Sequence, residues 1–460
     1  MFDLTDTICA LSSAPGRSGI AVVRISGQGC FSILDRVFQP AYLGRETPDR
    51  RAVFGRVIDP RDGGALDEAL ATRFRSPHSY TGEDVAEISV HGSPVVVAHL
   101  LDFLCLEGAR LAEPGEFTLR AFLHGRMDLA QAEAVRDVIE AQTLYQLQVA
   151  SRQKAGELSH RLEPLRRRLT DVAVELETMV EFSEEDLKPA PRAGLAGTLE
   201  EIAAELSRWV DSFRAGRLVR TGFTLAIAGR PNVGKSSLFN ALLAEERSIV
   251  TEIPGTTRDL VSESVEIAGI PVRLIDTAGL REGLDRIEQL GVDRSLRTVA
   301  DSDAVMLVLD GSRPPEEEDE RLRRELALQT GIVAFNKSDL GSAWTAPDRG
   351  SYAGSWPAVS VSALTGSGLD LLRLAIQGSV FGAAGCDRDG VLVTNARHHQ
   401  CLRAARQRAG SAAAALRDGL SEEFALVDLR GCLQQLGEIT GEHGIEELLG
   451  EIFRRFCIGK

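Results

Sequence analysis

The sequence has few cysteines and no closely paired ones. It carries seven cysteines in 460 residues, at positions 9, 30, 105, 386, 401, 432 and 457, and no two form a Cys-x-x-Cys pair. An odd, unpatterned set in a long chain argues against a disulfide framework or a structural zinc site, and it is typical of a reducing compartment. We therefore expect a cytoplasmic protein.

The sequence also lacks a surplus of basic charge and any long apolar run. Lys and Arg number 52 against 67 Asp and Glu, a formal net charge of −15, whereas a general nucleic-acid coat neutralises phosphates with surplus Lys and Arg. An RNA partner would therefore need a local basic patch or a second protein to hold it. The apolar stretch 95–106 is interrupted by His99 and Asp102 and is too short to span a bilayer. The acidic start lacks the features of a signal peptide, so we expect no membrane association.

The length of the chain and the changes in composition along it predict several domains. At about 150 residues per domain, a chain of this size predicts three domains, or two with an insertion. Residues 1–122 mix short β-rich runs, such as 20–25 and 85–90, with Gly and Pro turns. Alternating strands of this kind are typical of an α+β domain.

The remaining chain divides into helical and mixed segments. Segments 123–216 and 381–460 are rich in Ala, Leu, Glu and Arg, with apolar residues at helical spacing. Pro164 is predicted to interrupt the first of them. Between them, residues 217–380 alternate short apolar strands with helices. The predicted architecture is an α+β N-terminal domain, an all-α domain in two parts, and an α/β domain inserted into it.

The inserted domain contains a phosphate-binding loop. The apolar run 223–228 is typical of a buried parallel strand, and it leads into Gly229-Arg-Pro-Asn-Val-Gly-Lys-Ser236 and a helix-forming segment. The correct strand and helix flanks favour a phosphate loop over a chance glycine-rich turn. Lys235 reaches the outer phosphates and the Ser236 hydroxyl can hold Mg²⁺. The predicted nucleotide contacts are Asn232, Val233, Gly234, Lys235, Ser236 and Ser237.

A second motif identifies the base as guanine. Asn336-Lys337-Ser338-Asp339 ends another apolar strand. The Asp339 carboxylate can accept hydrogen bonds from N1–H and the exocyclic amine of guanine, and adenine offers neither, so the site would reject it. Alone, this motif is more often a surface turn, but here it follows a phosphate loop by about 100 residues. The predicted base contacts are Asn336, Lys337, Asp339, Ser362, Ala363 and Leu364, the last three offering a backbone N–H to guanine O6.

Two further segments complete a GTPase. Asp276-Thr277-Ala278-Gly279 supplies a carboxylate that orients Mg²⁺ through water and a Gly279 N–H for the γ-phosphate. In segment 254–259, Thr257 is predicted to bind Mg²⁺. Four motifs in this order predict a P-loop GTPase domain that binds GTP and GDP. Leu280 stands where Ras-type enzymes carry the glutamine that orients water, so another residue must do this.

These motifs, the leucine after them, the inserted domain and the ending Phe456-Cys457-Ile458-Gly459-Lys460 resemble the MnmE (TrmE) family of bacterial tRNA-modification GTPases within the TrmE–Era-like group. The resemblance runs along the whole chain. The segments that look like the front half of that family are Thr7-Ile8, Pro15-Gly16-Arg17, Thr81 to Val85, His91-Gly92, Pro114 to Phe117 and Asp128 to Ala134.

For the N-terminal domain, the resemblance implies a homodimerisation module that binds one-carbon tetrahydrofolate, in its 5,10-methylene or 5-formyl form. The residues similar in position to the family's folate contacts are Arg24, Glu87, Arg126 and Lys460. Arg126 stands where the family can carry lysine, which does not bind in the same geometry. For Arg24 and Glu87, the alternative is an ordinary strand ion pair.

For the GTPase domain, the resemblance implies pairing of two such domains across their nucleotide faces, with K⁺ supplying the charge of an arginine finger. The implied K⁺ ligands are Asn232, Thr251, Ile253 and Thr256, of which Thr251 and Thr256 are also implied GTP contacts. Glu288 would orient the water and act in catalysis beside Lys235. From the sequence alone, an exposed glutamate at a helix start is the commoner interpretation of Glu288.

The resemblance also implies partners. An FAD-carrying protein, MnmG (GidA), would form a heterocomplex with this chain and act on tRNA. Together they would form 5-carboxymethylaminomethyl or 5-aminomethyl uridine at the wobble position. Cys457 would lie near the folate and is a candidate catalytic residue, although a free terminal cysteine is often inert.

Two other functions stay open at this point. A GTP-switched ribosome-assembly or scaffold protein would need neither the folate-like front domain nor the terminal Cys-Ile-Gly-Lys. An ATP-using P-loop kinase is disfavoured by Asp339.

Overall fold

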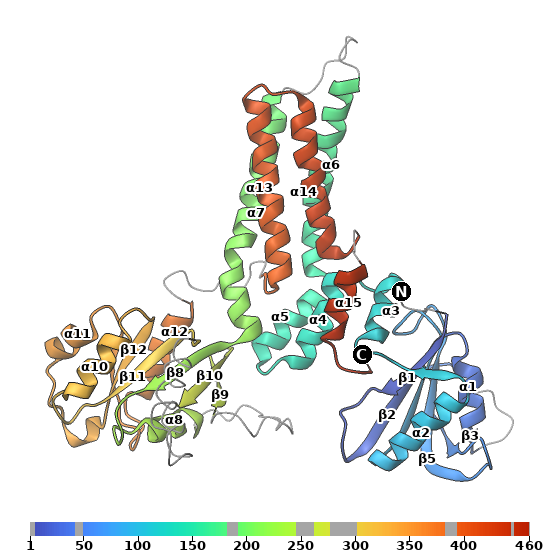
Figure 1. Ribbon diagram of the computed structural model, residues 1–460, viewed down its shortest axis with the longest axis horizontal. Helices are drawn as coiled ribbons and strands as arrows, with labels where there is room; N and C mark the ends of the chain where they lie inside the picture. Colours follow the sequence, from blue (N-terminus) through green and yellow to red (C-terminus); the bar gives the residue numbers. More distant parts are fainter. Residues whose placement is uncertain are drawn as a thin grey trace. The chain divides into compact units, whose positions relative to one another are not determined.

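The computed structural model describes residues 5–41, 49–181, 192–244, 262–276, 301–381, 393–442 and 446–459 (Figure 1). The chain forms two compact units. Unit 1 comprises Met1–Arg136, Arg152–Val174 and Leu429–Lys460, and unit 2 comprises Asp137–Ser151 and Glu175–Asp428. The predicted fold class is confirmed: an α+β N-terminal domain, a helical domain and an α/β P-loop domain.

Unit 1 contains a seven-stranded sheet in the order β3-β4-β5-β6-β2-β1-β7. Neighbouring strands are antiparallel except the parallel pair β1 and β7. The predicted strands 20–25 and 85–90 lie within β2 and β6, where Arg24 and Glu87 are direct cross-strand partners. The strands are β1 Thr7–Leu11, β2 Ser18–Ser26, β3 Phe38–Pro40, β4 Val53–Ile58, β5 Ala65–Phe74, β6 Val85–Gly92 and β7 Ala109–Leu111.

Two helices pack on this sheet, and a helical group holds the C-terminus. Helices α1 (Cys30–Val37) and α2 (Pro94–Leu106) bury Leu34, Leu100 and Leu104 against the strands (Figure 1). A second core joins α3 (Glu116–Leu123) and α4 (Leu129–Glu140) to α15 (Glu446–Arg454), through buried side chains that include Leu119, Leu129, Phe453 and Phe456. Residues from the two ends of the chain therefore share one core.

Unit 2 contains a six-stranded sheet in the order β13-β12-β11-β8-β10-β9, parallel except for β9. Strands β11 and β12 are buried along their whole length, as in a parallel sheet covered on both faces. In such sheets ligands bind at the carboxyl ends of the strands. The elements are β8 Phe223–Ala228, α8 Lys235–Ala244, β9 Ser262–Ile267, β10 Ile270–Asp276, β11 Ala304–Asp310, α10 Glu317–Glu325, β12 Gly331–Asn336, α11 Ala346–Ala353, β13 Ala358–Ser360 and α12 Leu369–Phe381.

Long helices precede and follow the sheet of unit 2 in the sequence. Helix α7 lies against α13, and the Phe213 ring stacks on His399 with centroids 4.1 Å apart. Because His399, early in α13, stacks on Phe213, late in α7, and Arg417 at the end of α13 pairs with Glu200 early in α7, the two helices are antiparallel. The remaining helices are α5 Leu144–Lys154, α6 Glu157–Glu181, α7 Arg192–Thr221, α13 Ala396–Arg417 and α14 Glu422–Thr440. In the part of the chain that the structure describes, no helix combines the length and hydrophobicity needed to cross a membrane.

The predicted interruption at Pro164 is wrong. Pro164 lies inside α6, which continues unbroken to Glu181. The neighbouring Leu162, Leu165 and Leu169 are almost completely buried. Tertiary packing of this apolar face offsets the hydrogen bond that proline removes.

Candidate functional site

The phosphate loop follows β8 and has the conformation expected of an anion cradle. Gly229 and Gly234 have φ of +150° and +94°, and Asn232 has φ of +61°. A Cβ at Gly234 would lie 2.3 Å from Asn336 Nδ2, so only glycine fits there. Lys235 is 6% exposed, and its Nζ donates to the carbonyls of Gly229 at 2.9 Å and Arg230 at 2.7 Å. The lysine is therefore held over the loop that would receive phosphate.

The hydroxyl predicted to bind Mg²⁺ meets the carboxylate predicted to orient it. Ser236 Oγ, at the start of α8, donates to Asp276 Oδ2 at 3.1 Å, at the end of β10. Asp276 is 6% exposed. A serine hydroxyl beside a carboxylate fits the hard-oxygen ligation that Mg²⁺ requires. No cluster of three or more His, Cys, Asp or Glu is found among the described residues.

The guanine motif is tied directly to the phosphate loop. Asn336, 2% exposed at the end of β12, donates from Nδ2 to Val233 O at 2.9 Å and accepts from Ala363 N at 3.0 Å. One side chain thus joins three of the predicted nucleotide segments. Ser237 and Leu364 are exposed beside them.

The other two residues of the guanine motif are each held by a partner. Asp339 is exposed and accepts from the buried Ser362 hydroxyl at 2.5 Å, which fixes the orientation of its carboxylate. Lys337 has φ of +63°, and its Nζ donates to Asp310 Oδ2 at 2.7 Å. Burial alone would raise the pKa of Asp310, but hydrogen bonds from Lys337 and Ser312 outweigh it and hold that pKa below its usual value.

In unit 1, the candidate folate residues Arg24 and Glu87 form an ion pair. Arg24 Nε and Nη2 donate to Glu87 Oε1 at 3.0 and 2.8 Å. Such a pair is also what an ordinary contact between neighbouring strands would give. The surroundings of Arg24, however, differ from those of a residue on an exposed strand. The Arg24 guanidinium lies 5.0 Å from the centre of the Tyr80 ring and 5.7 Å from that of Phe117. Aromatic rings around a guanidinium offer both stacking and cation–π contacts.

The C-terminal tail reaches the same place. Gly459 O accepts from Ser12 Oγ at 3.1 Å and from Arg24 Nη1 at 3.5 Å. Gly459 has φ of +90°, and a Cβ there would lie 2.1 Å from Leu11 O, so the tail lies flat on β1. Cys457 is an exposed free thiol whose carbonyl accepts from Gly115 N at 3.4 Å.

Arg126 is exposed and lies beside the turn that carries Tyr80. Gly82 lies in that turn, and a Cβ atom added to it would be 3.4 Å from Cγ of Arg126. The structure therefore brings Arg24, Glu87, Tyr80, Phe117 and Gly459 together, and it places Arg126 at the neighbouring turn.

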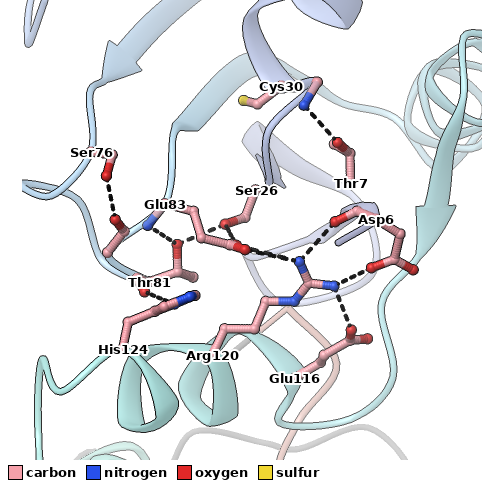
Figure 2. A network of polar contacts seen from close by, with 12 residues as sticks. Asp6, Thr7, Ser26, Cys30, Ser76, Thr81, Glu83, Glu116, Arg120 and His124 are labelled. Carbon is pink, nitrogen blue, oxygen red and sulfur yellow. Dashed lines mark hydrogen bonds and ion pairs between the residues drawn. The ribbon is translucent and has the colours of Figure 1, made fainter. Parts of the chain in front are cut away.

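A buried ion network supports this site (Figure 2). Arg120 is fully buried, and its Nη groups contact Asp6 Oδ1 at 2.5 Å, Glu116 Oε1 at 3.0 Å and Glu83 Oε1 at 3.2 Å. Three segments distant in the sequence are thereby joined at one guanidinium. Glu83 is three residues after Tyr80, and Glu116 directly precedes Phe117, so the network holds both aromatic residues in place.

Two carboxyls of this network, those of Glu116 and Asp6, have a lowered pKa. Burial alone would raise the pKa of Glu116, but hydrogen bonds from Arg110, the Glu113 amide and Arg120 outweigh it, so that pKa lies below its usual value. Burial alone would likewise raise the pKa of Asp6, but Arg110 and Arg120 outweigh it, so that pKa also lies below its usual value. A buried arginine is tolerated only when such partners surround it.

Several predicted residues lie outside the described residues. They are Thr251, Ile253, Thr256, Thr257, Thr277, Ala278, Gly279, Glu288 and Lys460. Their predicted roles in GTP, Mg²⁺, K⁺ and folate binding stay predictions.

The sequence did not point to several residues that the structure places at these sites. Phe117 ends one of the segments that resemble the family and Tyr80 directly precedes another, but no periodicity marks either as a ring contact for Arg24. Asp310 could have been noticed as an acidic residue at a strand end, next to the strand that carries the guanine motif.

Comparisons with known proteins agree with this organisation. The profile described as GTP-binding protein TrmE N-terminus matches residues 7–126, and that of the MnmE helical domain matches residues 129–457. The protein named tRNA modification GTPase MnmE from Koribacter versatilis is 42% identical over 459 residues, covering 100% of both chains. Proteins of the same name from Moorella thermoacetica and Aquifex aeolicus are 44% and 41% identical, each covering 99% of this chain and 100% of the relative.

A solved structure, the G domain of the T. maritima FeoB iron transporter, covers 34% of this chain and 98% of its own at 31% identity, with a TM-score of 0.28. This likeness is partial, and the assignment rests on the full-length relatives and the two family profiles. The chain belongs to the MnmE family of tRNA modification GTPases.

Proposed function

We propose that this chain is a potassium-stimulated GTPase that forms 5-carboxymethylaminomethyl or 5-aminomethyl uridine at the tRNA wobble position, together with an FAD-carrying partner and one-carbon tetrahydrofolate. The observation that carries the proposal is the presence of two separate sites in one member of this family. One has the residues of a guanine-nucleotide site, and the other surrounds Arg24 with aromatic rings and the C-terminal tail.

In the nucleotide site, Asp339 selects guanine and Lys235 neutralises phosphate charge. The contact between Ser236 and Asp276 supports a Mg²⁺ ion held by the serine hydroxyl and oriented by the carboxylate through water. Thr257 would supply a further ligand. Mg²⁺ supplies charge to the β- and γ-phosphate oxygens when it is bound.

Asn232 is the residue we assign to K⁺. Its left-handed backbone, with φ of +61°, is rare for a residue other than glycine and is typical of functional loops. Its exposed side-chain amide oxygen has the chemistry to bind a monovalent cation. With Thr251, Ile253 and Thr256, it would hold K⁺ beside the phosphates, and Glu288 would orient the attacking water.

In unit 1, the residues present fit a reduced folate. Tyr80 and Phe117 supply aromatic faces for a pterin ring, and Glu87 supplies an acceptor for its ring N–H groups. Arg24 supplies a cation close to the tail of the chain, where Lys460 and Arg126 would add two more. Folate supplies the one-carbon unit when it is bound.

The remaining parts of the proposal concern partners. The chain would act as a homodimer and bind MnmG, which carries FAD, so that tRNA meets both proteins. Cys457 is exposed, two residues before the Gly459 that contacts Arg24, and would take part in the modification chemistry. A scaffold without modification chemistry would not need this second site.

The experiment that tests the proposal measures GTP turnover of the full-length chain in potassium and in sodium at matched ionic strength. The proposal predicts a large preference for potassium. Equal rates in the two salts would contradict cation-assisted hydrolysis and favour the GTP-switched assembly protein.

A further inference from the structure

Arg230, the second residue of the phosphate loop, does not extend into solvent. Its side chain is only 12% exposed and lies between two carboxylates at the start of α10. Its Nε donates to Asp319 Oδ1 at 2.8 Å, and its Nη1 pairs with Glu316. The phosphate loop is therefore anchored to a helix that begins more than eighty residues later in the chain.

The acceptor in this contact is a fixed, buried group. Asp319 is 2% exposed, and its second oxygen accepts from the Glu316 amide at 3.0 Å, which closes the first turn of α10. A charge buried in this way is destabilising when its partner is removed, unlike an exposed surface pair. The contact between Arg230 and Asp319 is thus a strong restraint on the side chain of Arg230.

The backbone of Arg230 contacts a residue of the nucleotide site directly. Its carbonyl accepts from Lys235 Nζ at 2.7 Å, and the neighbouring Gly229 carbonyl accepts from the same Nζ at 2.9 Å. The loop also contains the left-handed Asn232, a conformation that persists only where surrounding contacts hold it. The Arg230 side chain provides such a contact two residues away.

The segment that receives Arg230 also contacts the guanine motif. It begins at Asp310, whose carboxylate accepts from Lys337 Nζ at 2.7 Å, and it ends at Asp319. Residues 310–319, which we name the bracket, therefore touch the guanine loop at one end and the phosphate loop at the other. Asn336 joins the same two loops independently, through Val233.

We propose that Arg230 is a positioning residue for nucleotide binding, which holds the phosphate loop in its binding conformation by clamping it to the bracket. A loop that is already ordered loses less conformational freedom when the ligand binds, and affinity rises accordingly. The inference rests on the GTP site proposed above and adds a residue to it that contacts no nucleotide through its side chain.

The test compares variants of the full-length chain by titration with a fluorescent GDP and a non-hydrolysable GTP analogue. For Arg230→Gln we expect both dissociation constants to rise about tenfold, while kcat at saturating GTP stays within about threefold of wild type. Arg230→Lys keeps the positive charge but cannot contact both carboxylates as the planar guanidinium does. Its nucleotide affinity should therefore lie between those of wild type and Arg230→Gln. Asp319→Asn should resemble Arg230→Gln, and the double variant should be no weaker than Arg230→Gln alone.

A matched control lies on the same helix. Arg321 forms an exposed i, i+4 pair with Glu325 at 2.8 Å and has a side chain that is 69% exposed. Arg321→Gln removes an arginine from α10 without touching the phosphate loop, and nucleotide affinity should be unchanged. Thermal unfolding of each variant separates a loss of affinity from a loss of fold.

Three results would overturn the inference. The first is a nucleotide affinity of Arg230→Gln within twofold of wild type, whatever its thermal stability. The second is a double variant whose loss of affinity equals the sum of the two single losses. The third is a loss of affinity in Arg321→Gln as large as that in Arg230→Gln. A wild-type chain that binds no guanine nucleotide would overturn the proposed function and this inference together. Normal wild-type binding beside an unaffected Arg230→Gln would overturn this inference alone.

Discussion

The two candidate sites of this chain are built in different ways. The nucleotide site of unit 2 is assembled from residues that end or follow β8, β10 and β12, so each motif is contiguous in the sequence. The site of unit 1 takes single residues from β1, β2, β6, a turn, α3 and the C-terminal tail, and one of its hydrogen bonds joins Ser12 to Gly459. A parallel sheet gathers its loops at one edge, whereas an antiparallel sheet presents residues on a face that depends on register.

This difference predicts different sensitivities. The phosphate loop binds chiefly through backbone groups, so side-chain changes there, apart from those at the anchoring Arg230, should alter selectivity or rate. The unit 1 site depends on side-chain ion pairs and rings, so single substitutions should weaken binding itself. Changes in one site should leave ligand binding at the other unchanged.

The largest expected effect is that of Asp339→Asn. The amide cannot accept from both guanine N–H groups, so GTP and GDP affinity should fall at least about a hundredfold. Xanthine nucleotides, which carry a carbonyl at carbon 2, should gain affinity. Titration with both nucleotides measures the switch, and folate binding should be unaffected. Undiminished GDP affinity would contradict the base assignment.

Glu288→Ala should affect rate without affecting binding. Turnover of GTP should fall about a hundredfold, because the attacking water loses the group that orients it, while GDP affinity is retained. Single-turnover kinetics at saturating GTP is the direct measurement. Wild-type turnover in this variant would remove Glu288 from the mechanism.

For Asn232→Ala, the potassium response should disappear while nucleotide affinity is largely kept. Wild type should turn over GTP about tenfold or more faster in potassium than in sodium, because the ion stabilises transition-state charge. Asn232→Ala should turn over GTP at the same rate in both salts. Asn240→Ala, an exposed asparagine on α8, is the matched control. Equal stimulation of Asn232→Ala and wild type would refute the K⁺ assignment.

Arg24→Ala tests the other site. Loss of a charge-assisted contact should raise the dissociation constant for a reduced folate about tenfold, with GTP turnover unchanged. Arg56→Ala, an exposed arginine on β4 of the same sheet, should bind folate normally. If Arg24→Ala binds folate as wild type does, the ion pair with Glu87 is an ordinary strand contact.

The smallest effect concerns acid stability. The pKa of Glu116 is lowered in the folded chain from a value of 4.5. Its contribution to stability is therefore complete above that value and is lost as the pH falls through the folded pKa. Unfolding temperatures measured from pH 5 to pH 3 should fall more steeply for wild type than for Glu116→Gln. Equal slopes would show that the buried network does not contribute in this way.

Much of the fold and of the nucleotide site could be predicted from the sequence, because β8 and β12 are continuous apolar runs that end in recognisable motifs. The same contiguity predicted Ser236 in the phosphate loop after β8, Asp276 at the end of β10 and Asp339 just after β12, where the structure has them. Pro164 misled the helix prediction, since burial of its leucine neighbours is a tertiary effect.

Contacts between distant residues could not be predicted in this way. The Arg120 network joins Asp6 and Glu83, and no local pattern marks those two carboxylates as its partners; Glu116, four residues before Arg120 on the same helix, is the one partner at a helical spacing. The contact of Arg230 with Asp319 spans 89 positions. Both depend on how elements pack, which a single sequence does not reveal.

The most direct test of the account is transfer of a labelled one-carbon unit from tetrahydrofolate to tRNA. The full-length chain would be combined with the proposed FAD-carrying partner, tRNA and GTP, with Glu288→Ala as the variant expected to bind GTP but hydrolyse it slowly. The account predicts label in the wobble uridine only with wild type and hydrolysable GTP. Equal labelling without GTP, or no labelling in the complete mixture, would contradict it.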